Sequence, residues 1–305
     1  MVRASLTILV FAVSLRLLTA GQQTPASEVV ADAPSKYPPS SYLRVTRNLE
    51  YARYNDRKLH LDLYLPSRDN TAPLPVIVVV RGGGWHFGDK EGFAFIAGYL
   101  AEAGFAAACI EYRPTEEAPF PAAVYDVKAA VRWLRANAAH YRLDTSRIGA
   151  IGGSAGGHLV ALLGTSAEEP ALEGPGGNSG FSSRVTAVVA MAPLTDFRLT
   201  WFQPGGKDGA AFLGAGLTAG DNRLLLASPV THVTASAPPL LLMHSRTDAE
   251  VSYQQSLELK ARYEARGRPV ELITVEDAPH AFWNYSRWFP EAMVQAIDFF
   301  RRTLR

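Results

Sequence analysis

Ser154 lies in a short glycine-rich segment that could expose a reactive hydroxyl group. Residues 152–157 read Gly-Gly-Ser-Ala-Gly-Gly, between a strand-like run at 147–151 and a helix-forming run at 158–163. Glycines two residues before and two residues after the serine give the spacing G-x-S-x-G, in which a strand turns sharply into a helix and larger side chains would collide. Free backbone N–H groups at the start of such a helix stabilise a developing oxyanion. The segment therefore predicts a serine nucleophile at the end of a strand.

Glycine-rich turns between a strand and a helix also bind phosphate groups. A dinucleotide site requires G-x-G-x-x-G, and a P-loop requires Lys followed by Ser or Thr where the loop closes. Neither pattern occurs at residues 152–157. The segment therefore favours nucleophilic catalysis over nucleotide binding.

The serine needs two partners, which the sequence offers after later strands. A serine hydroxyl becomes nucleophilic at neutral pH when a base accepts its proton and a third group orients that base. The partners are expected in the chain order serine, acid, histidine. Asp248 follows a strand predicted at 240–244, and His280 follows one predicted at 270–275. We therefore expect Asp248 and His280 to form a triad with Ser154.

Two other acids and six other histidines are alternative candidates. Glu276 and Asp277 are nearer to His280 in sequence, but they belong to its own loop, so the position after a strand favours Asp248. Among the 7 histidines, His280 has the required order and position. The others are expected in an early hairpin (His60), beside a second glycine-rich loop (His86), in the last turn of a helix (His140), inside the helix after the serine (His158), in a loop (His232) and at the end of a strand (His244).

A second glycine-rich loop follows a strand predicted at 75–80. It reads Arg81-Gly82-Gly83-Gly84-Trp85. Because glycines carry no side chain, the backbone N–H groups of Gly82 and Gly83 can approach a substrate carbonyl, together with the N–H of Ala155. Three glycines are also compatible with a simple tight turn. The occurrence of both loops in one chain favours an oxyanion hole.

Strands and helices alternate along most of the chain. Hairpin strands are expected at 42–54 and 59–65, buried strands at 75–80, 104–111, 148–152, 185–191, 240–244 and 270–275, and helices at 92–103, from Pro121 and from about Pro290. This alternation predicts an α/β fold with a mostly parallel central sheet, flanked by helices on both faces and opened by an antiparallel pair. Residues 165–183 are expected to form a surface loop, and residues 193–237 a small cap over the site.

The N-terminal segment is typical of an exported protein. Residues 1–21 contain a basic residue, an apolar stretch and small residues ending in Ala20-Gly21, and residues 22–41 are polar. This order is typical of a signal peptide followed by a flexible leader, which leaves residues 42–305 as the folded domain. No later stretch is apolar enough for long enough to cross a membrane. We therefore expect a secreted or periplasmic protein, cleaved near Ala20 or Gly21.

The composition excludes some classes of partner. The chain has 305 residues, 48% of them hydrophobic, and a formal net charge of +1. Charges of both signs are interspersed without a basic cluster that contains aromatic residues, which argues against nucleic-acid binding. Cys109 is the only cysteine, so no internal disulfide can form, and its apolar surroundings predict a core position. The composition leaves the oligomeric state open.

These motifs resemble those of the α/β-hydrolase superfamily, in its carboxylesterase branch with an H-G-G-G oxyanion loop. That branch includes hormone-sensitive-lipase-like enzymes and bacterial feruloyl-esterase-like carbohydrate esterases. The resemblance runs from about residue 43 to the C-terminus and includes Glu111-Tyr112-Arg113, the segment 118–126 and Pro238-Pro239. The sequence departs from the usual pattern twice: Arg81 replaces a histidine, and Ser245 replaces a glycine before the acid.

The resemblance implies hydrolysis of small carboxylic esters, such as acetyl or feruloyl groups on plant cell-wall carbohydrates, with no metal and no organic cofactor. The residues expected around the substrate are Trp85, His86, Tyr112, Trp201 and Trp283. Alternatives on the same fold are a general short-chain carboxylesterase or lipase, a serine peptidase and a formamidase. A binding protein without catalysis is disfavoured because every catalytic position is filled.

Overall fold

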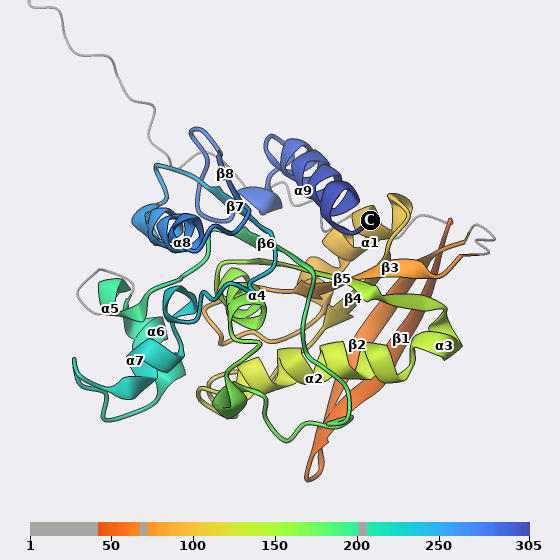
Figure 1. The fold of residues 1–305 in the computed structure, drawn as a ribbon, viewed down its shortest axis with the longest axis horizontal. Helices are drawn as coiled ribbons and strands as arrows, with labels where there is room; N and C mark the ends of the chain where they lie inside the picture. Colours follow the sequence, from red (N-terminus) through yellow and green to blue (C-terminus); the bar gives the residue numbers. More distant parts are fainter. Residues whose placement is uncertain (1–41, 68–71, 201–205) are drawn as a thin grey trace, which may run out of the picture. The chain divides into compact units, whose positions relative to one another are not determined.

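A central sheet positions the chemically interesting residues. The computed structural model describes residues 42–67, 72–200 and 206–305, and these contain an eight-stranded sheet in the order β1-β2-β4-β3-β5-β6-β7-β8 (Figure 1). The strands are β1 (Leu43–Tyr54), β2 (Arg57–Pro66), β3 (Leu74–Val80), β4 (Ala106–Ile110), β5 (Leu143–Gly153), β6 (Ala187–Met191), β7 (Leu240–His244) and β8 (Val270–Thr274). The β1–β2 and β2–β4 pairs are antiparallel, and all the other pairs are parallel. The carboxyl ends of β3, β5, β7 and β8 therefore meet at one edge of the sheet.

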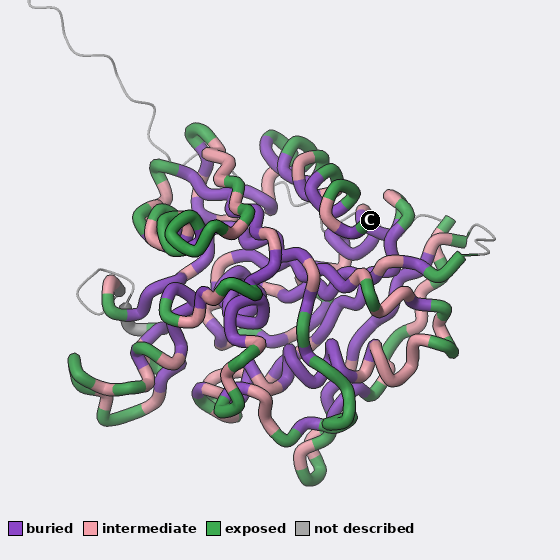
Figure 2. Tube along the Cα trace, in the orientation of Figure 1, coloured by how far each residue is buried: buried purple, intermediate pink, exposed green. Residues whose placement is uncertain are grey.

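Helices cover both faces of the sheet. They are α1 (Ala94–Glu102), α2 (Ala122–Ala136), α3 (Ala138–Tyr141), α4 (Ala155–Thr165), α5 (Phe197–Thr200), α6 (Gly206–Leu213), α7 (Asn222–Leu226), α8 (Gln254–Ala265) and α9 (Phe289–Thr303). Side chains of β3 alternate between the two faces: Val76, Val78 and Val80 belong to the core cluster that includes α2, α4 and α8, whereas Ile77 and Val79 belong to the cluster that includes α1 and α9. Figure 2 shows the central strands as buried and the outer sides of α8 and α9 as exposed, whereas the edge strands β1 and β8 are partly exposed. The predicted α/β class is confirmed.

The predicted elements appear with two differences. The strand expected at 148–152 begins earlier, at Leu143, where it pairs with β3 across an irregularity in register. Helix α8 was not predicted from the sequence. Its buried stripe includes the polar residues Gln255 and Ser256 beside Leu259 and Tyr263, which hides the apolar period that marks a helix in sequence.

The segment expected to form a cap contains α5, α6, α7 and a 3₁₀ turn at Pro229–Thr231. Phe197, Phe212 and Leu224 from these elements join the same hydrophobic core as α2 and α4. The segment is therefore anchored to the core by buried side chains.

Two other expectations concern the N-terminus and Cys109. The predicted signal peptide and leader, residues 1–41, lie outside the described residues. No helix among the described residues has the length and apolar character needed to cross a bilayer. Cys109 is buried, and its thiol donates a hydrogen bond to the carbonyl of Lys90 at 3.0 Å.

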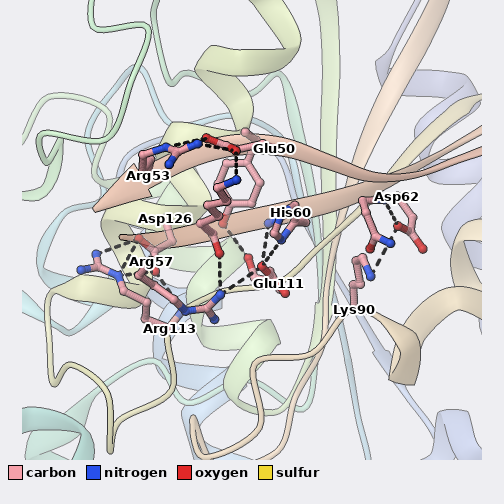
Figure 3. A network of polar contacts seen from close by, with 12 residues as sticks. Glu50, Arg53, Arg57, His60, Asp62, Lys90, Glu111, Arg113 and Asp126 are labelled. Carbon is pink, nitrogen blue, oxygen red and sulfur yellow. Dashed lines mark hydrogen bonds and ion pairs between the residues drawn. The ribbon is translucent and has the colours of Figure 1, made fainter. Parts of the chain in front are cut away.

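A buried ion pair anchors the chain after β4 to helix α2 (Figure 3). The Arg113 guanidinium donates to both carboxylate oxygens of Asp126 at 2.7–3.1 Å, and the Arg113 backbone N–H donates to the same carboxylate at 2.9 Å. The Asp126 side chain is fully buried, and the guanidinium carbon lies 3.6 Å from the centre of the Tyr54 ring. Removing either Arg113 or Asp126 would leave the charge of the other residue without its partner.

We expect Asp126→Ala to lower the free energy of unfolding by about 3–5 kcal/mol, because it leaves Arg113 unpaired. Glu50→Ala is the control, since Glu50 pairs with Arg53 on the surface nearby (Figure 3) and should cost less than about 1 kcal/mol. Urea unfolding followed by circular dichroism measures both values. Equal losses for the two variants would contradict this account of the buried pair.

Candidate active site

Ser154 occupies the turn between β5 and α4 in a strained conformation, with φ 55° and ψ −122°. A side chain at Gly152 would collide with the backbone oxygen of Gly156. A side chain at Gly156 would collide with the backbone oxygen of Val80 and lie 2.6 Å from that of Arg81. Only glycine fits at both positions, which is the steric reason for the spacing in the sequence. The turn is held by a 2.8 Å hydrogen bond from the Ser154 N–H to the carbonyl of Met191.

The structure brings Ser154, His280 and Asp248 into one hydrogen-bonded chain. The distance from Ser154 Oγ to His280 Nε2 is 2.8 Å, and that from His280 Nδ1 to Asp248 Oδ2 is 2.7 Å. An ionised carboxylate only accepts hydrogen bonds, so Nδ1 carries the proton and Nε2 accepts from the serine hydroxyl. This tautomer prepares His280 to receive the serine proton.

The side chain of Asp248 is fully buried and surrounded by donors. Its Oδ1 accepts from the N–H groups of Glu250 at 2.9 Å and Val251 at 2.8 Å. Its Oδ2 lies 2.7 Å from His280 Nδ1 and 3.2 Å from His244 Nε2. Burial raises the pKa of Asp248, but hydrogen bonds from His244, His280 and Val251 outweigh burial and hold that pKa well below its usual range. Asp248 therefore stays ionised at neutral pH.

The other candidate acids lie outside this hydrogen-bonded chain. Glu276 is 70% exposed, and its side chain lies 3.9 Å from that of Arg246. Asp277 is exposed on a turn with φ 52°. The acidic side chains within 4 Å of His280 among the described residues are Asp248 and Glu250. Geometry therefore favours Asp248 as the orienting acid.

The predicted oxyanion loop, residues 81–85, lies directly against the serine turn. A Cβ at Gly82 would collide with the backbone oxygen of Gly153 and lie 3.1 Å from Ser154 Cβ. Gly83 has φ +121°, a conformation that favours glycine. Ala155 is the first residue of α4, where backbone N–H groups lack helical partners. The structure therefore places Gly82 and Gly83 in the wall of the cavity that contains Ser154, and Ala155 directly after the serine.

A cavity of about 380 Å³ opens beside these groups. Its lining includes two of the predicted substrate contacts, His86 and Trp283, together with Ser154 and His280. Sequence analysis missed further lining residues: Phe87, Phe93, Asp208, Glu250 and Asn284. No motif in the sequence marked these residues, because they come from loops and from the segment expected to form a cap. Among the described residues, no group of His, Cys, Asp and Glu side chains has the arrangement of a metal site.

Trp85 does not line this cavity, contrary to expectation. Its ring is 2% exposed and stacks on Phe212 of α6, with ring centres 4.5 Å apart. The indole N–H donates to His158 Nδ1 at 3.2 Å, and His158 Nε2–H donates to the carbonyl of Ala227 at 2.8 Å. Burial lowers the pKa of His158 to about 4, which keeps it neutral and able to accept from the indole. Trp85 therefore ties the oxyanion loop to α4 and to the cap.

Tyr112 is also buried, and Trp201 lies outside the described residues. The Tyr112 hydroxyl is 3.1 Å from the carbonyls of both Arg81 and Phe87, so it links the two ends of the segment 81–87. Size and aromatic character suggested a substrate contact for Trp85 and Tyr112. In the structure the same properties serve packing, because both rings are buried and the polar atom of each has a hydrogen-bond partner within the protein.

Comparison with known proteins agrees with this geometry. A model of the BD-FAE family matches residues 61–263. The chain therefore belongs to the BD-FAE family. LipM of Mycobacterium tuberculosis, a probable carboxylic ester hydrolase, is 32% identical over 283 residues, which cover 85% of this chain and 62% of LipM. The chain spans about three fifths of the length of the curated relatives it matches.

Solved structures of esterases share the fold of this BD-FAE protein. A truncated carbohydrate esterase from gut microbiota is 29% identical, with a TM-score of 0.75, and the match covers 85% of this chain and 96% of that one. An acetyl ester-xyloside bifunctional hydrolase from Caldicellulosiruptor lactoaceticus is 25% identical, with a TM-score of 0.72, and the match covers 81% and 89% of the two chains. The resemblance to carboxylesterase-type α/β-hydrolases is confirmed.

Two residues of this BD-FAE protein depart from the sequence pattern of the branch. The Arg81 guanidinium forms an ion pair with Asp89 and lies 5.8 Å from the centre of the Phe87 ring, while Asp89 also accepts from the Gly92 N–H at 3.0 Å. Arg81 therefore closes the loop that follows the glycines. Ser245 is buried, and its hydroxyl oxygen accepts from the Thr247 N–H at 3.2 Å. It supports the turn that leads to the acid.

Proposed function

We propose that this protein hydrolyses carboxylic esters through a covalent acyl-enzyme, with Ser154 as nucleophile, His280 as general base and Asp248 as orienting acid. The observation that carries the proposal is the hydrogen-bonded chain from Ser154 Oγ through His280 to Asp248 beside a glycine-rich loop. Membership of the BD-FAE family and the esterases among its relatives support the same activity.

The first half of the reaction forms the acyl-enzyme. Ser154 Oγ bonds to the ester carbonyl carbon while its proton passes to His280 Nε2, and Asp248 stabilises the resulting imidazolium. The negative charge on the carbonyl oxygen is held by the N–H groups of Gly82, Gly83 and Ala155. The carbon–oxygen bond to the alcohol then breaks, and the alcohol leaves with the proton from His280.

The second half releases the acid. Water takes the place of the alcohol, gives its proton to His280 Nε2 and bonds to the acyl carbon. The bond to Ser154 Oγ breaks, and His280 returns the proton to the serine oxygen. The strained turn keeps the hydroxyl in position for both halves, so no large movement of the nucleophile is required.

For the substrate, we propose acetyl or feruloyl esters of plant cell-wall carbohydrates. The proposal is supported by relatives that are a carbohydrate esterase and an acetyl ester-xyloside hydrolase. A cavity of about 380 Å³ lined by Phe87, Phe93 and Trp283 has the size and the aromatic walls that suit a small ester. Release of acetate or ferulate from plant polysaccharides tests this assignment, and activity confined to short alkyl esters would favour a general carboxylesterase.

We also propose that residues 1–21 are a signal peptide, that residues 22–41 form a leader and that the protein is exported. The support is the apolar N-terminal stretch with its small-residue end. N-terminal sequencing of the protein recovered from the cell envelope should start near Ala20 or Gly21. A retained Met1 would contradict export by cleavage.

We expect Ser154→Ala to reduce hydrolysis of 4-nitrophenyl acetate by roughly a thousandfold or more, because it removes the only atom that can form the acyl-enzyme. Release of 4-nitrophenol measures the rate, and thermal unfolding checks that the variant is folded. If the unmodified protein is no faster than this variant, the esterase proposal fails. Turnover of formamides or peptides with little turnover of acetyl esters would favour amide hydrolysis.

The acid assignment gives a paired prediction. Asp248→Asn should lower kcat roughly 10³- to 10⁴-fold, because an amide facing His280 favours the wrong tautomer. Asp277→Asn is the matched control on the histidine loop and should stay within about twofold of the unmodified protein, as expected for an exposed side chain. The reverse result would assign the role to Asp277.

A further inference from the structure

A carboxylate lies beside the proposed general base at the mouth of the cavity. Glu250 Oε2 is 3.9 Å from His280 Nε2, and the Glu250 side chain is 74% exposed. The Glu250 backbone N–H donates to Asp248 Oδ1 at 2.9 Å, which fixes the start of this side chain relative to the triad. Glu250 also lines the cavity together with Ser154.

The position of Glu250 assigns it to the alcohol side of the substrate. During acyl transfer, His280 Nε2 must come within about 3 Å of the leaving oxygen in order to protonate it. Glu250 Oε2 lies 3.9 Å from the same nitrogen. The carboxylate therefore lies near the position of the leaving oxygen and can contact the groups attached to it.

Among the described residues, the basic side chain within 4 Å of Glu250 is His280, and the other basic groups of the cavity wall are partnered by different carboxylates. Arg81 is paired with Asp89. His86 lies between Glu116 and Asp208, with its Nε2 3.4 Å from Asp208 Oδ1. The hydrogen bond with Glu116, with a further contribution from Asp208, raises the pKa of His86 against the opposing effect of burial.

Carboxylates therefore already partner both of these basic side chains. Asp208 adds a second negative charge to the cavity wall. The electrostatic field of these two carboxylates at the cavity mouth favours positive over negative groups on the alcohol part of the substrate.

We propose that Glu250 selects the alcohol part of the ester, favouring neutral polyols and alcohols with an ammonium group and disfavouring alcohols with a carboxylate. The inference rests on the proposed ester hydrolysis and narrows its substrate class to esters of neutral or amino sugars over esters of uronic acids. The carboxylate accepts hydrogen bonds from hydroxyl or ammonium donors and repels an anion.

Two substrate ratios test the proposal, using Glu250→Gln in the full chain. The first ratio is kcat/KM for acetylcholine over its neutral analogue in which carbon replaces nitrogen. The second is kcat/KM for O-acetylglycolate over propyl acetate. Every substrate carries the same acetyl group, so a change in His280 that affects all the acetates equally cancels within each ratio.

We expect Glu250→Gln to lower the first ratio and raise the second, each by about threefold to fivefold at low ionic strength, as one exposed charge allows. High salt should reduce both effects below about twofold, because it screens exposed charges. Glu276→Gln is the matched control. It removes an equally exposed carboxylate from the histidine loop, outside the cavity lining, and should keep both original ratios.

The possible outcomes separate this inference from the proposed function. If the unmodified protein hydrolyses the acetates but either ratio in Glu250→Gln stays within about twofold of the original, the selection by Glu250 is overturned. The same conclusion follows if Glu276→Gln changes the ratios equally. If the unmodified protein hydrolyses none of the acetates, the proposed ester hydrolysis itself fails.

Discussion

The lack of space around the turn between β5 and α4 is the constraint on which the rest of the site depends. The backbone of this turn packs against the end of β3, so Gly152 and Gly156 cannot carry side chains. That contact holds Ser154 at φ 55° with its hydroxyl toward His280. Strain of this kind persists only where the surroundings over-determine the conformation. The parallel pairing of β3 with β5 supplies that determination and brings the oxyanion loop beside the serine.

A second layer of buried polar contacts keeps the reacting groups aligned. Asp248 is held by two backbone N–H groups and two histidines, so its charge and its direction are both fixed. On the opposite side, the hydrogen bonds from Trp85 to His158 and from His158 to Ala227 join the oxyanion loop, the serine helix and the cap. Preorganised donors of this type need no reorganisation when charge develops in the transition state. The cap therefore contributes to the site through packing as well as through the residues that line the cavity.

Local sequence patterns predicted much of this arrangement. The residues whose positions they did not predict are those placed by contacts with distant parts of the chain. The elbow and the strand ends carry short-range rules of sterics and chain order, so Ser154, His280 and Asp248 could be nominated from spacing alone. The large aromatic residues carry no such rule. Trp85 and Tyr112 suit a pocket or a core equally well, and their burial was decided by partners distant in sequence. Helix α8 was missed because Gln255 and Ser256 occupy buried positions, which interrupts the apolar period of the helix in the sequence.

The sequence by itself determined the strand-to-helix turn and the alternation of strands and helices, because each depends on contacts or periods within a few residues. It also indicated the candidate triad, through the order of the three residues along the chain and their positions after predicted strands. Only the tertiary structure decided which side chains surround the substrate cavity. Glu250 faces His280, and Asp208 reaches the cavity from the cap, because loops from separate strand ends converge at one edge of the sheet. Charge and shape at that edge are sums over segments far apart in the chain, and no local pattern contains them.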